Sequence, residues 1–277
     1  MSKAAIASGL VIAIIGFLAL FAPALAPYGP LEQDLANNYA GPSLEHPFGT
    51  DDLGRDIWSR LLFGARISLG IAFASVGFAL LVGTLVGLLS AYHGGLVDAS
   101  LMRLMDVLLA FPGILLGIAV VVVLGNGVET TVIAVAVMST PTFARLVRGS
   151  ALSILERDHV AASRALGASA ARVIFGQVLP NALTPLVVAS TLQLGTAILI
   201  ASGLSFLGLG VQPPHPEWGA MLSKGRELVR ATPVAAFAPG FFITVLVLSF
   251  SLLGDGLRDA LDPKHRRLRY GTRAGVK

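Results

Sequence analysis

Six long stretches of mostly apolar residues limit this chain to the architecture of a membrane protein. They cover residues 4–26, 67–91, 106–124, 129–147, 183–206 and 235–254. A helix rises about 1.5 Å per residue and needs about 20 apolar residues to cross the hydrocarbon of a bilayer. Lipid offers backbone N–H and C=O groups no partner, and the stretches lack the alternating pattern of barrel strands. The sequence therefore predicts an all-α membrane protein with six transmembrane helices.

The rest of the composition excludes several classes of function. Charged residues make up 13% of the chain and cysteine is absent, which rules out disulfides, a thiolate nucleophile and a cysteine-ligated metal. The five histidines are scattered and form no H-E-x-x-H, and no G-x-x-x-x-G-K-[ST] loop occurs. We therefore expect no catalytic residue, metal site or cofactor in this chain. The net charge of +4 is assigned to membrane topology, and no nucleic-acid partner is expected.

The positions of lysine and arginine predict the orientation of the spans. With the N-terminus inside, fourteen cations are cytoplasmic: Lys3, Arg103, Arg145, Arg148, Arg157, Arg164, Arg172 and seven from Arg258 to Lys277. Six are external: Arg55, Arg60, Arg66, Lys224, Arg226 and Arg230. The positive-inside rule thus places both termini in the cytoplasm.

The first span can also be read as a signal peptide, because "ALA" at 24–26 resembles a cleavage site. Its apolar run is long for such a peptide and Pro27 would follow the cut, so we expect an uncleaved helix over 1–26.

Residues 27–66 are expected to form an external segment. Asp51 and Asp52 can cap a helix that runs through Trp58 and Leu62. We expect this helix to lie on the outer face of the membrane, ahead of the second span.

Three further segments connect or follow the spans. Residues 92–106 are expected to form a short cytoplasmic turn, and 257–277 a basic cytoplasmic tail. The external segment 208–233 predicts a short helix from Glu217 to Val229, with Trp218 as an interfacial anchor.

The span interiors contain few polar groups. No Asp, Glu, Lys, Arg or His lies near the middle of any of them, and Gln193 is the most polar side chain at depth. Ion-coupled carriers usually keep charged residues there, and a self-sufficient secondary transporter also predicts inverted repeats. Gly83 and Gly87 form a G-x-x-x-G in the second span, which indicates close helix packing.

The cytoplasmic segment "RDHVAASRALGASAARVIFGQVLPN" (157–181) is long and polar for so apolar a chain. It predicts one helix over 158–166 and another over 169–178. Asp158 and Ser169 can cap the two helices, Gly167 breaks the first, and Pro180 marks the entry to the fifth span. Small side chains at Ala161, Ala162 and Ala165 would let another protein approach closely. On these grounds alone, a docking helix and a simple amphipathic connector both remain open, and a structural membrane scaffold would need no docking helix.

The segment resembles the cytoplasmic "EAA" loop of ABC importer permeases, whose pattern is E-A-A, three residues, G, nine residues, I-x-L-P. Four positions match: Ala162, Gly167, Leu179 and Pro180. Three depart: Ala161 stands at the Glu position, Ser163 at the second Ala and Gln177 at the Ile. The missing Glu removes any salt bridge that it would make.

Longer blocks resemble the second permease subunit of dipeptide, oligopeptide and nickel importers. They are "HPFGTDDLGRDIWSRLLFGARISL", "GGLVDASLMRLMDVLLAFP", "ASRALGAS", "LPNALTPL", "LSFLGLGVQPPHPEWGAML" and "GDGLRDALDPK", spread over 46–264. The resemblance implies a type I ABC importer permease in a bacterial inner membrane. It implies an extra first helix before a five-helix core over 67–256, whose coupling loop covers 148–182.

The resemblance also implies partners and a mechanism. The partners would be a homologous permease, two ATPase subunits or domains that bind ATP and Mg, and an external solute-binding protein. In alternating access the coupling contact would be Ala161, Ala162, Ser163, Arg164 and Gly167, and a Cβ at Gly167 could obstruct the turn. Peptides fit best as solute. Nickel or a nickel chelate is the alternative, and glutathione-like or antimicrobial peptides stay open.

Overall fold

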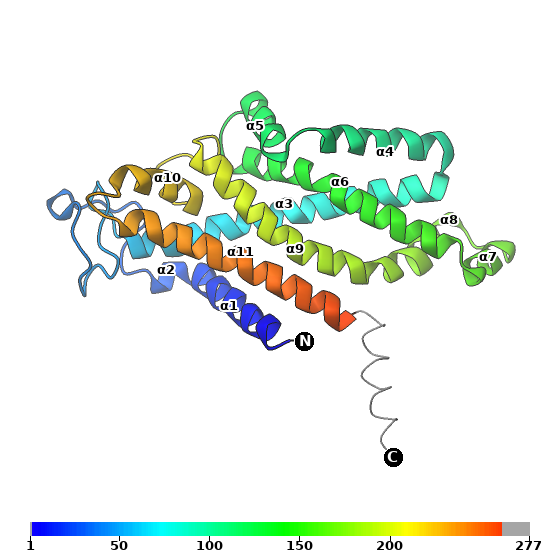
Figure 1. Ribbon diagram of the computed structural model, residues 1–277, viewed down its shortest axis with the longest axis horizontal. Coiled ribbons are helices and arrows are strands. Elements are labelled where there is room, and N and C mark those ends of the chain that lie inside the picture. Colours follow the sequence, from blue (N-terminus) through cyan, green and yellow to red (C-terminus); the bar gives the residue numbers. More distant parts are fainter. Residues whose placement is uncertain (1, 262–277) are drawn as a thin grey trace, which may run out of the picture.

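The computed structural model describes residues 2–261, and within this range long helices lie side by side (Figure 1). Five helices are long and apolar enough to cross a membrane: α1 (Lys3–Leu20), α3 (Ile57–His93), α6 (Val128–Leu155), α9 (Leu179–Phe206) and α11 (Val234–Leu261). The shorter elements are α2 (Ala22–Leu25), η1 (Leu35–Asn37), α4 (Gly95–Ala110), α5 (Gly113–Leu124), α7 (Asp158–Ala165), α8 (Ala170–Val173), the π-helical turn η2 (Ile174–Val178) and α10 (Trp218–Leu228). The predicted all-α class is confirmed for the described residues.

The predicted third span is a broken one. Helices α4 and α5 are long and apolar enough to cross a membrane only when taken together, and they meet at an angle of 96°. Pro112 lies at the break and Phe111 before it is extended, because proline disfavours the helical conformation in the preceding residue. The prediction of a short turn over 92–106 was therefore wrong, since a helix begins at Gly95.

The prediction of a separate interfacial helix ahead of the second span was also wrong. The helix begins at Ile57 and continues unbroken as α3 to His93. Asp56 caps it, accepting a hydrogen bond from the Ser59 N–H at 2.7 Å. Asp51 cannot serve as the cap because its carboxylate binds the guanidinium and the backbone N–H of Arg55.

Helix α10 confirms the short helix predicted in the second external segment, with Glu217 as its N-cap. The prediction that Trp218 is an interfacial anchor was wrong. Its side chain is only 1% exposed, and its Nε1–H donates to the Leu61 carbonyl at 3.0 Å. The indole therefore joins α10 to the first turns of α3.

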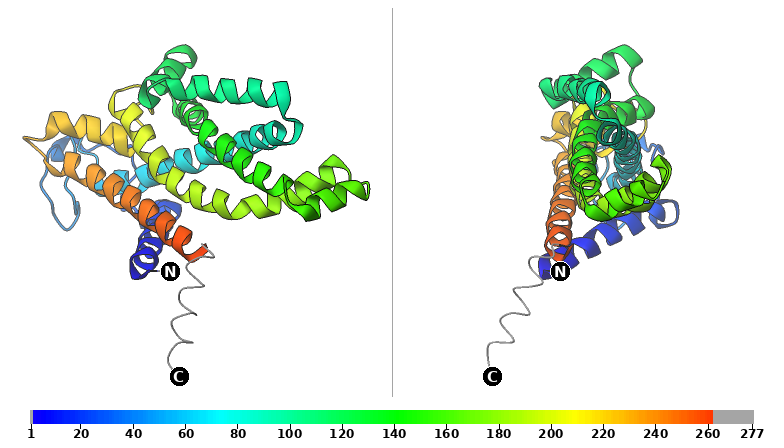
Figure 2. Two further views of the ribbon diagram at one scale, coloured as in Figure 1. Left: turned by 45° about the vertical axis from the view of Figure 1, so that its right-hand side comes forward. Right: turned by 90° about the vertical axis from the view of Figure 1, so that its right-hand side faces the viewer.

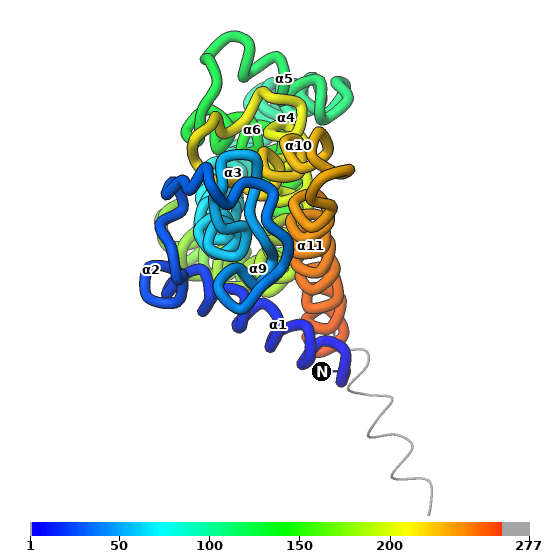
Figure 3. The backbone as a smooth tube through the Cα atoms, turned by 90° about the vertical axis from the view of Figure 1, so that its left-hand side faces the viewer, coloured from blue at the N-terminus to red at the C-terminus, as the bar shows by residue number. Residues whose placement is uncertain are grey.

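Helix α1 lies at the periphery of the bundle beside α11 (Figure 3). Ala5 of α1 sits so close to Gly256 of α11 that a Cβ on that glycine would overlap it. The first turns of α1 and the last turns of α11 therefore lie at one end of the bundle. The end that carries α7 points the same way, and α10 lies at the opposite end (Figure 1). That the α7 end is cytoplasmic stays a prediction, and most of the predicted basic tail (262–277) lies outside the described residues.

The packing role predicted for Gly83 and Gly87 is confirmed in the contact between α3 and α6. A Cβ at Gly83 would lie 2.6 Å from the Phe143 Cβ, and one at Gly87 would lie 2.5 Å from the Ala144 carbonyl oxygen. Both distances are well below van der Waals contact. Only glycine lets the two backbones approach this closely.

We predict that Gly87→Val separates α3 from α6 and destabilises the protein. Overpacking of this kind costs about 1–3 kcal/mol, so the thermal unfolding midpoint of the purified protein should fall by several degrees. Gly77→Val is the matched control, because a Cβ at Gly77 in the same helix meets nothing within 4 Å. Equal midpoints for the two variants would contradict the packing account.

Candidate functional site

Residues 156–178, between α6 and α9, form a tip that projects beyond the end of the bundle (Figure 2). Helix α7 ends at Ala165, which confirms the first predicted helix to within one residue. The second predicted helix is one α-helical turn, α8, followed by the π-helical turn η2, which leads directly into α9. The tip is thus continuous in sequence with two long helices of the bundle.

The caps of the tip differ in part from the prediction. Asp158 is the first helical residue of α7, and Arg157 occupies the N-cap without a side-chain hydrogen bond. Asp158 still places its carboxylate near the positive end of the helix dipole. Ser169 caps α8 as predicted, because its hydroxyl accepts from the Arg172 N–H at 3.4 Å.

Gly167 ends α7 in a left-handed conformation, with φ at +85°. Its N–H donates to the Arg164 carbonyl at 2.9 Å, and the Ala168 N–H donates to the Ser163 carbonyl at 3.0 Å. These two bonds make a Schellman motif. A Cβ at Gly167 would meet nothing within 4 Å, so the expectation that it could obstruct the turn was wrong. The backbone conformation is what requires glycine there.

The five residues predicted to form the coupling contact lie together on this tip. Ala161, Ala162, Arg164 and Gly167 are exposed, while Ser163 is half-buried. Val160 is fully buried and holds the inner face of α7 against the protein core. The exposed side chains of α7 are therefore three alanines, Ala161, Ala162 and Ala165, together with the polar Asp158, His159 and Arg164. The adjoining Leu166 is 89% exposed.

Besides the packing of Val160, two side-chain contacts connect α7 to other described elements. The Gln177 Nε2 donates to the Ser163 hydroxyl at 2.8 Å, which joins α7 to η2. The Arg164 guanidinium lies over the Tyr92 ring at 5.5 Å from its centroid, which joins α7 to the end of α3. Inspection of the sequence missed both contacts, because neither pair has a motif of its own.

Ion pairs join α4 to α6. Arg148 of α6 donates two hydrogen bonds to the Asp98 carboxylate, each at 2.6 Å, and the Ser90 hydroxyl donates to the same group. Farther along, Arg145 pairs with Asp106 at 2.5 Å, and this pair is about half exposed. Helix α4 is thus attached to the same helix that carries the tip.

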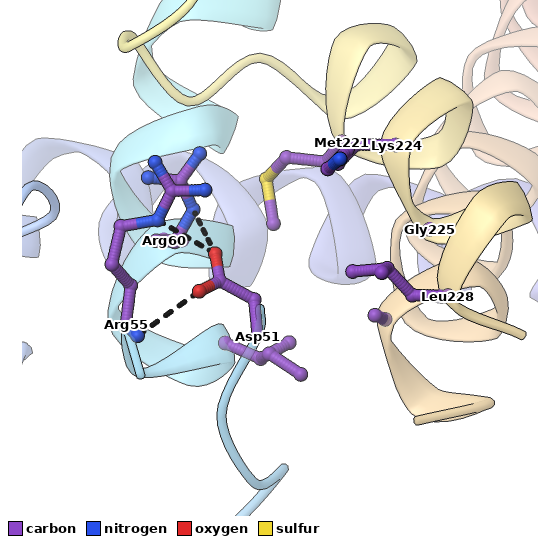
Figure 4. A pocket seen from close by; sticks show the side chains of 9 residues that line it. Asp51, Arg55, Arg60, Met221, Lys224, Gly225 and Leu228 are labelled. Carbon is purple, nitrogen blue, oxygen red and sulfur yellow. Dashed lines mark hydrogen bonds and ion pairs between the residues drawn. The ribbon is translucent and has the colours of Figure 1, made fainter. Parts of the chain in front are cut away.

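The opposite end of the bundle holds a second charged cluster, around a small pocket (Figure 4). Asp51 accepts from Arg55 at 2.7 Å, and the Lys224 ammonium reaches Asp52 and Glu227 at 3.2 and 3.1 Å. Hydrogen bonds to Glu227 and Asp52 raise the pKa of Lys224. The Arg60 guanidinium also donates to the Pro30 carbonyl at 2.7 Å. Opposite charges are paired throughout, so the cluster fastens the segment before α3 to α3 and α10.

Comparison with known proteins identifies the class to which this fold and tip belong. The family described as binding-protein-dependent transport system inner membrane component matches residues 83–267, and the N-terminal TM domain of oligopeptide transport permease C matches 1–42. The chain belongs to this family of ABC importer permeases.

Several curated relatives match almost the whole chain. The dipeptide transport system permease protein DppC of Alkalihalophilus pseudofirmus is 46% identical over 95% of this chain and 86% of the relative. The di/tripeptide permease DppC of Pseudomonas aeruginosa is 46% identical over 95% and 89%. The glutathione transport system permease protein GsiD of Escherichia coli O157:H7 is 48% identical over 94% and 86%.

Two solved structures share the fold at low sequence identity. The inward-facing MetNI methionine ABC transporter aligns with a TM-score of 0.59 at 22% identity, covering 73% of this chain and 96% of that chain. An amino acid ABC transporter aligns with a TM-score of 0.54 at 16% identity, covering 70% and 90%. The predicted ABC importer permease fold is confirmed.

We predict that the pair between Asp98 and Arg148 stabilises the protein more than the pair between Asp106 and Arg145. The first is bidentate and its side chains are 22% and 33% exposed, against 49% and 52% for the second. Asp98→Ala should cost about 1 kcal/mol, whereas Asp106→Ala should cost close to nothing. Thermal unfolding of the two purified variants measures the difference, and a larger loss for Asp106→Ala would overturn this ranking.

Proposed function

We propose that this chain pairs with a homologous permease to form the passage of a peptide importer in the bacterial inner membrane. Two ATPase subunits or domains drive it, and an external solute-binding protein delivers the solute. The supporting observation is the tip itself, because it projects from the bundle and exposes three alanines of α7 among polar side chains. It occupies the position of the family's cytoplasmic loop, and both termini are proposed to lie on the same side.

The proposed docking surface is the outward face of α7. Ala161, Ala162 and Arg164 present side chains to the groove of an ATPase, whereas Ser163 and Gly167 determine the shape and position of the helix. Small residues allow close approach of another protein's surface. The exposed Leu166 adds an apolar side chain at the end of this surface.

Movement of α7 reaches the spans through the two helices that flank it. Helices α6 and α9 each have 28 residues, and both belong to the same apolar core as α3. When ATP brings the two ATPases together, a displaced α7 carries the ends of α6 and α9 with it. The passage then opens to the outside and, after hydrolysis, to the inside. The ATPases can drive this change only if they bind the two states of the permease with different affinity.

Peptides are the proposed solutes, because relatives similar over nearly the whole chain are named for dipeptide, di/tripeptide and glutathione transport. One polar contact between two of the spans is uncharged: Gln193 of α9 donates to the Ser139 hydroxyl of α6 at 2.8 Å. A passage without charged side chains near its middle would suit zwitterions whose side chains vary. No observation within residues 2–261 specifically favours the nickel alternative.

We predict that Gly167→Val uncouples ATP hydrolysis from peptide uptake. A non-glycine residue in the left-handed region costs roughly 1–2 kcal/mol, so ATP-driven uptake into proteoliposomes should fall about tenfold. ATP hydrolysis by the assembled transporter, measured in the same vesicles, should no longer respond to the binding protein.

Two controls make this prediction specific. Gly167→Asn should retain most of the uptake, because asparagine tolerates the left-handed conformation. Gly149→Val, in an open part of α6, should leave coupling intact. If Gly167→Val transports and couples like the unaltered protein, α7 is not the docking helix.

A further inference from the structure

Two of the three departures from the family pattern contact each other. Ser163 replaces an alanine and Gln177 replaces an isoleucine, and the Gln177 Nε2 donates to the Ser163 hydroxyl at 2.8 Å. The alanine and isoleucine of the pattern could not form this hydrogen bond. The two positions are 14 residues apart, on opposite sides of the Gly167 turn, so the bond joins the two arms of the tip.

Each partner is held so that it faces the other. Ser163 lies three residues after the buried Val160, which places both on the inner face of α7. Gln177 belongs to the π-helical turn η2, and its backbone carbonyl accepts a hydrogen bond from the Asn181 side-chain amide at 2.6 Å. A π-turn changes the phase of the side chains relative to a regular helix, and such turns are frequent at functional sites.

The Gln177 amide depends on Ser163. Its Oε1 is shielded from solvent and has no hydrogen-bond partner among the described residues, so the bond to Ser163 is the only one that its side chain makes there. Removing the serine hydroxyl would leave this half-buried amide, with its shielded Oε1, without a partner among the described residues, which costs more than the loss of one bond. Removing the glutamine instead leaves a hydroxyl that can turn to a carbonyl of its own helix.

We propose that Ser163 and Gln177 are a positioning pair that fixes the orientation of α7 relative to α9, replacing the apolar pair of the family pattern. This inference rests on the proposed docking of an ATPase on α7. The pair does not touch solute or nucleotide. It determines how far a displacement of α7 is passed to α9, and therefore how much ATP is consumed for each solute moved.

A double-mutant cycle in the complete transporter tests the pair. The transporter is purified with its partner subunits through a tag on this chain and reconstituted, and a radiolabelled dipeptide serves as the probe. The measured quantity is the ATP hydrolysed per dipeptide taken up. Ser163→Ala should raise this ratio about fivefold, and Gln177→Ile should raise it less.

The double variant Ser163→Ala/Gln177→Ile restores the alanine and isoleucine of the family pattern, and it should return the ratio to that of the unaltered protein. Ser163→Thr keeps the hydroxyl and should also couple normally, so the test does not depend on the folding of Ser163→Ala. The thermal unfolding midpoint should not follow the ratio across these variants. A purely structural bond would instead move both together.

Two results would overturn the inference: a double variant whose ratio is the product of the single effects, or ratios that are equal in all variants. Gly167→Val in the same vesicles separates this failure from a failure of the proposed function. If Gly167→Val uncouples while the pair variants do not, only the positioning pair is wrong. If Gly167→Val also has no effect, the docking site on α7 is wrong as well.

Discussion

The close approach of α3 and α6 is the contact on which the rest of the bundle depends. Lipid tails are as apolar as the helices themselves, so association within a membrane relies on van der Waals packing. Gly83 and Gly87 provide it by letting Phe143 and the Ala144 carbonyl lie directly against the α3 backbone. Helix α6 continues past this contact to Leu155 and carries α7 at its end. The contact that stabilises the bundle therefore also supports the tip.

The two ends of the bundle are fastened in different ways. At the α10 end, Trp218 is buried against α3, and Glu217 accepts from the Ser68 hydroxyl at 3.0 Å. Ion pairs then tie the segment before α3 to the same helices. At the other end α7 is held by the buried Val160, one hydrogen bond and one cation–π contact. Segments with few buried contacts move at low cost, so the α7 end is the more easily displaced of the two.

The sequence predicted the elements whose signals are local. Apolar length located most of the spans, and Gly167 and Ser169 marked the turn within the tip. The break at Pro112 was missed, because the charges that α4 carries among its apolar residues suggested a loop. Asp51 looked like a helix cap because nothing in the sequence showed that Arg55 occupies its carboxylate. The contact between Ser163 and Gln177 has no local signal, since it depends on a π-turn and on a reversal of the chain.

Residues that depart from a family pattern are interpreted as a pair when their side chains contact each other, and singly when they do not. Ser163 and Gln177 each weaken the match when read singly, yet together they form a hydrogen bond that the alanine and isoleucine of the pattern could not form. Ala161 is different, because it is exposed and nothing in the described chain substitutes for the missing Glu. With ATPase docking on α7, the groove therefore meets a neutral methyl where a carboxylate would stand. Docking of this chain then relies on shape at that position, and the nearest acidic side chain in α7 is Asp158, in the first turn of the helix.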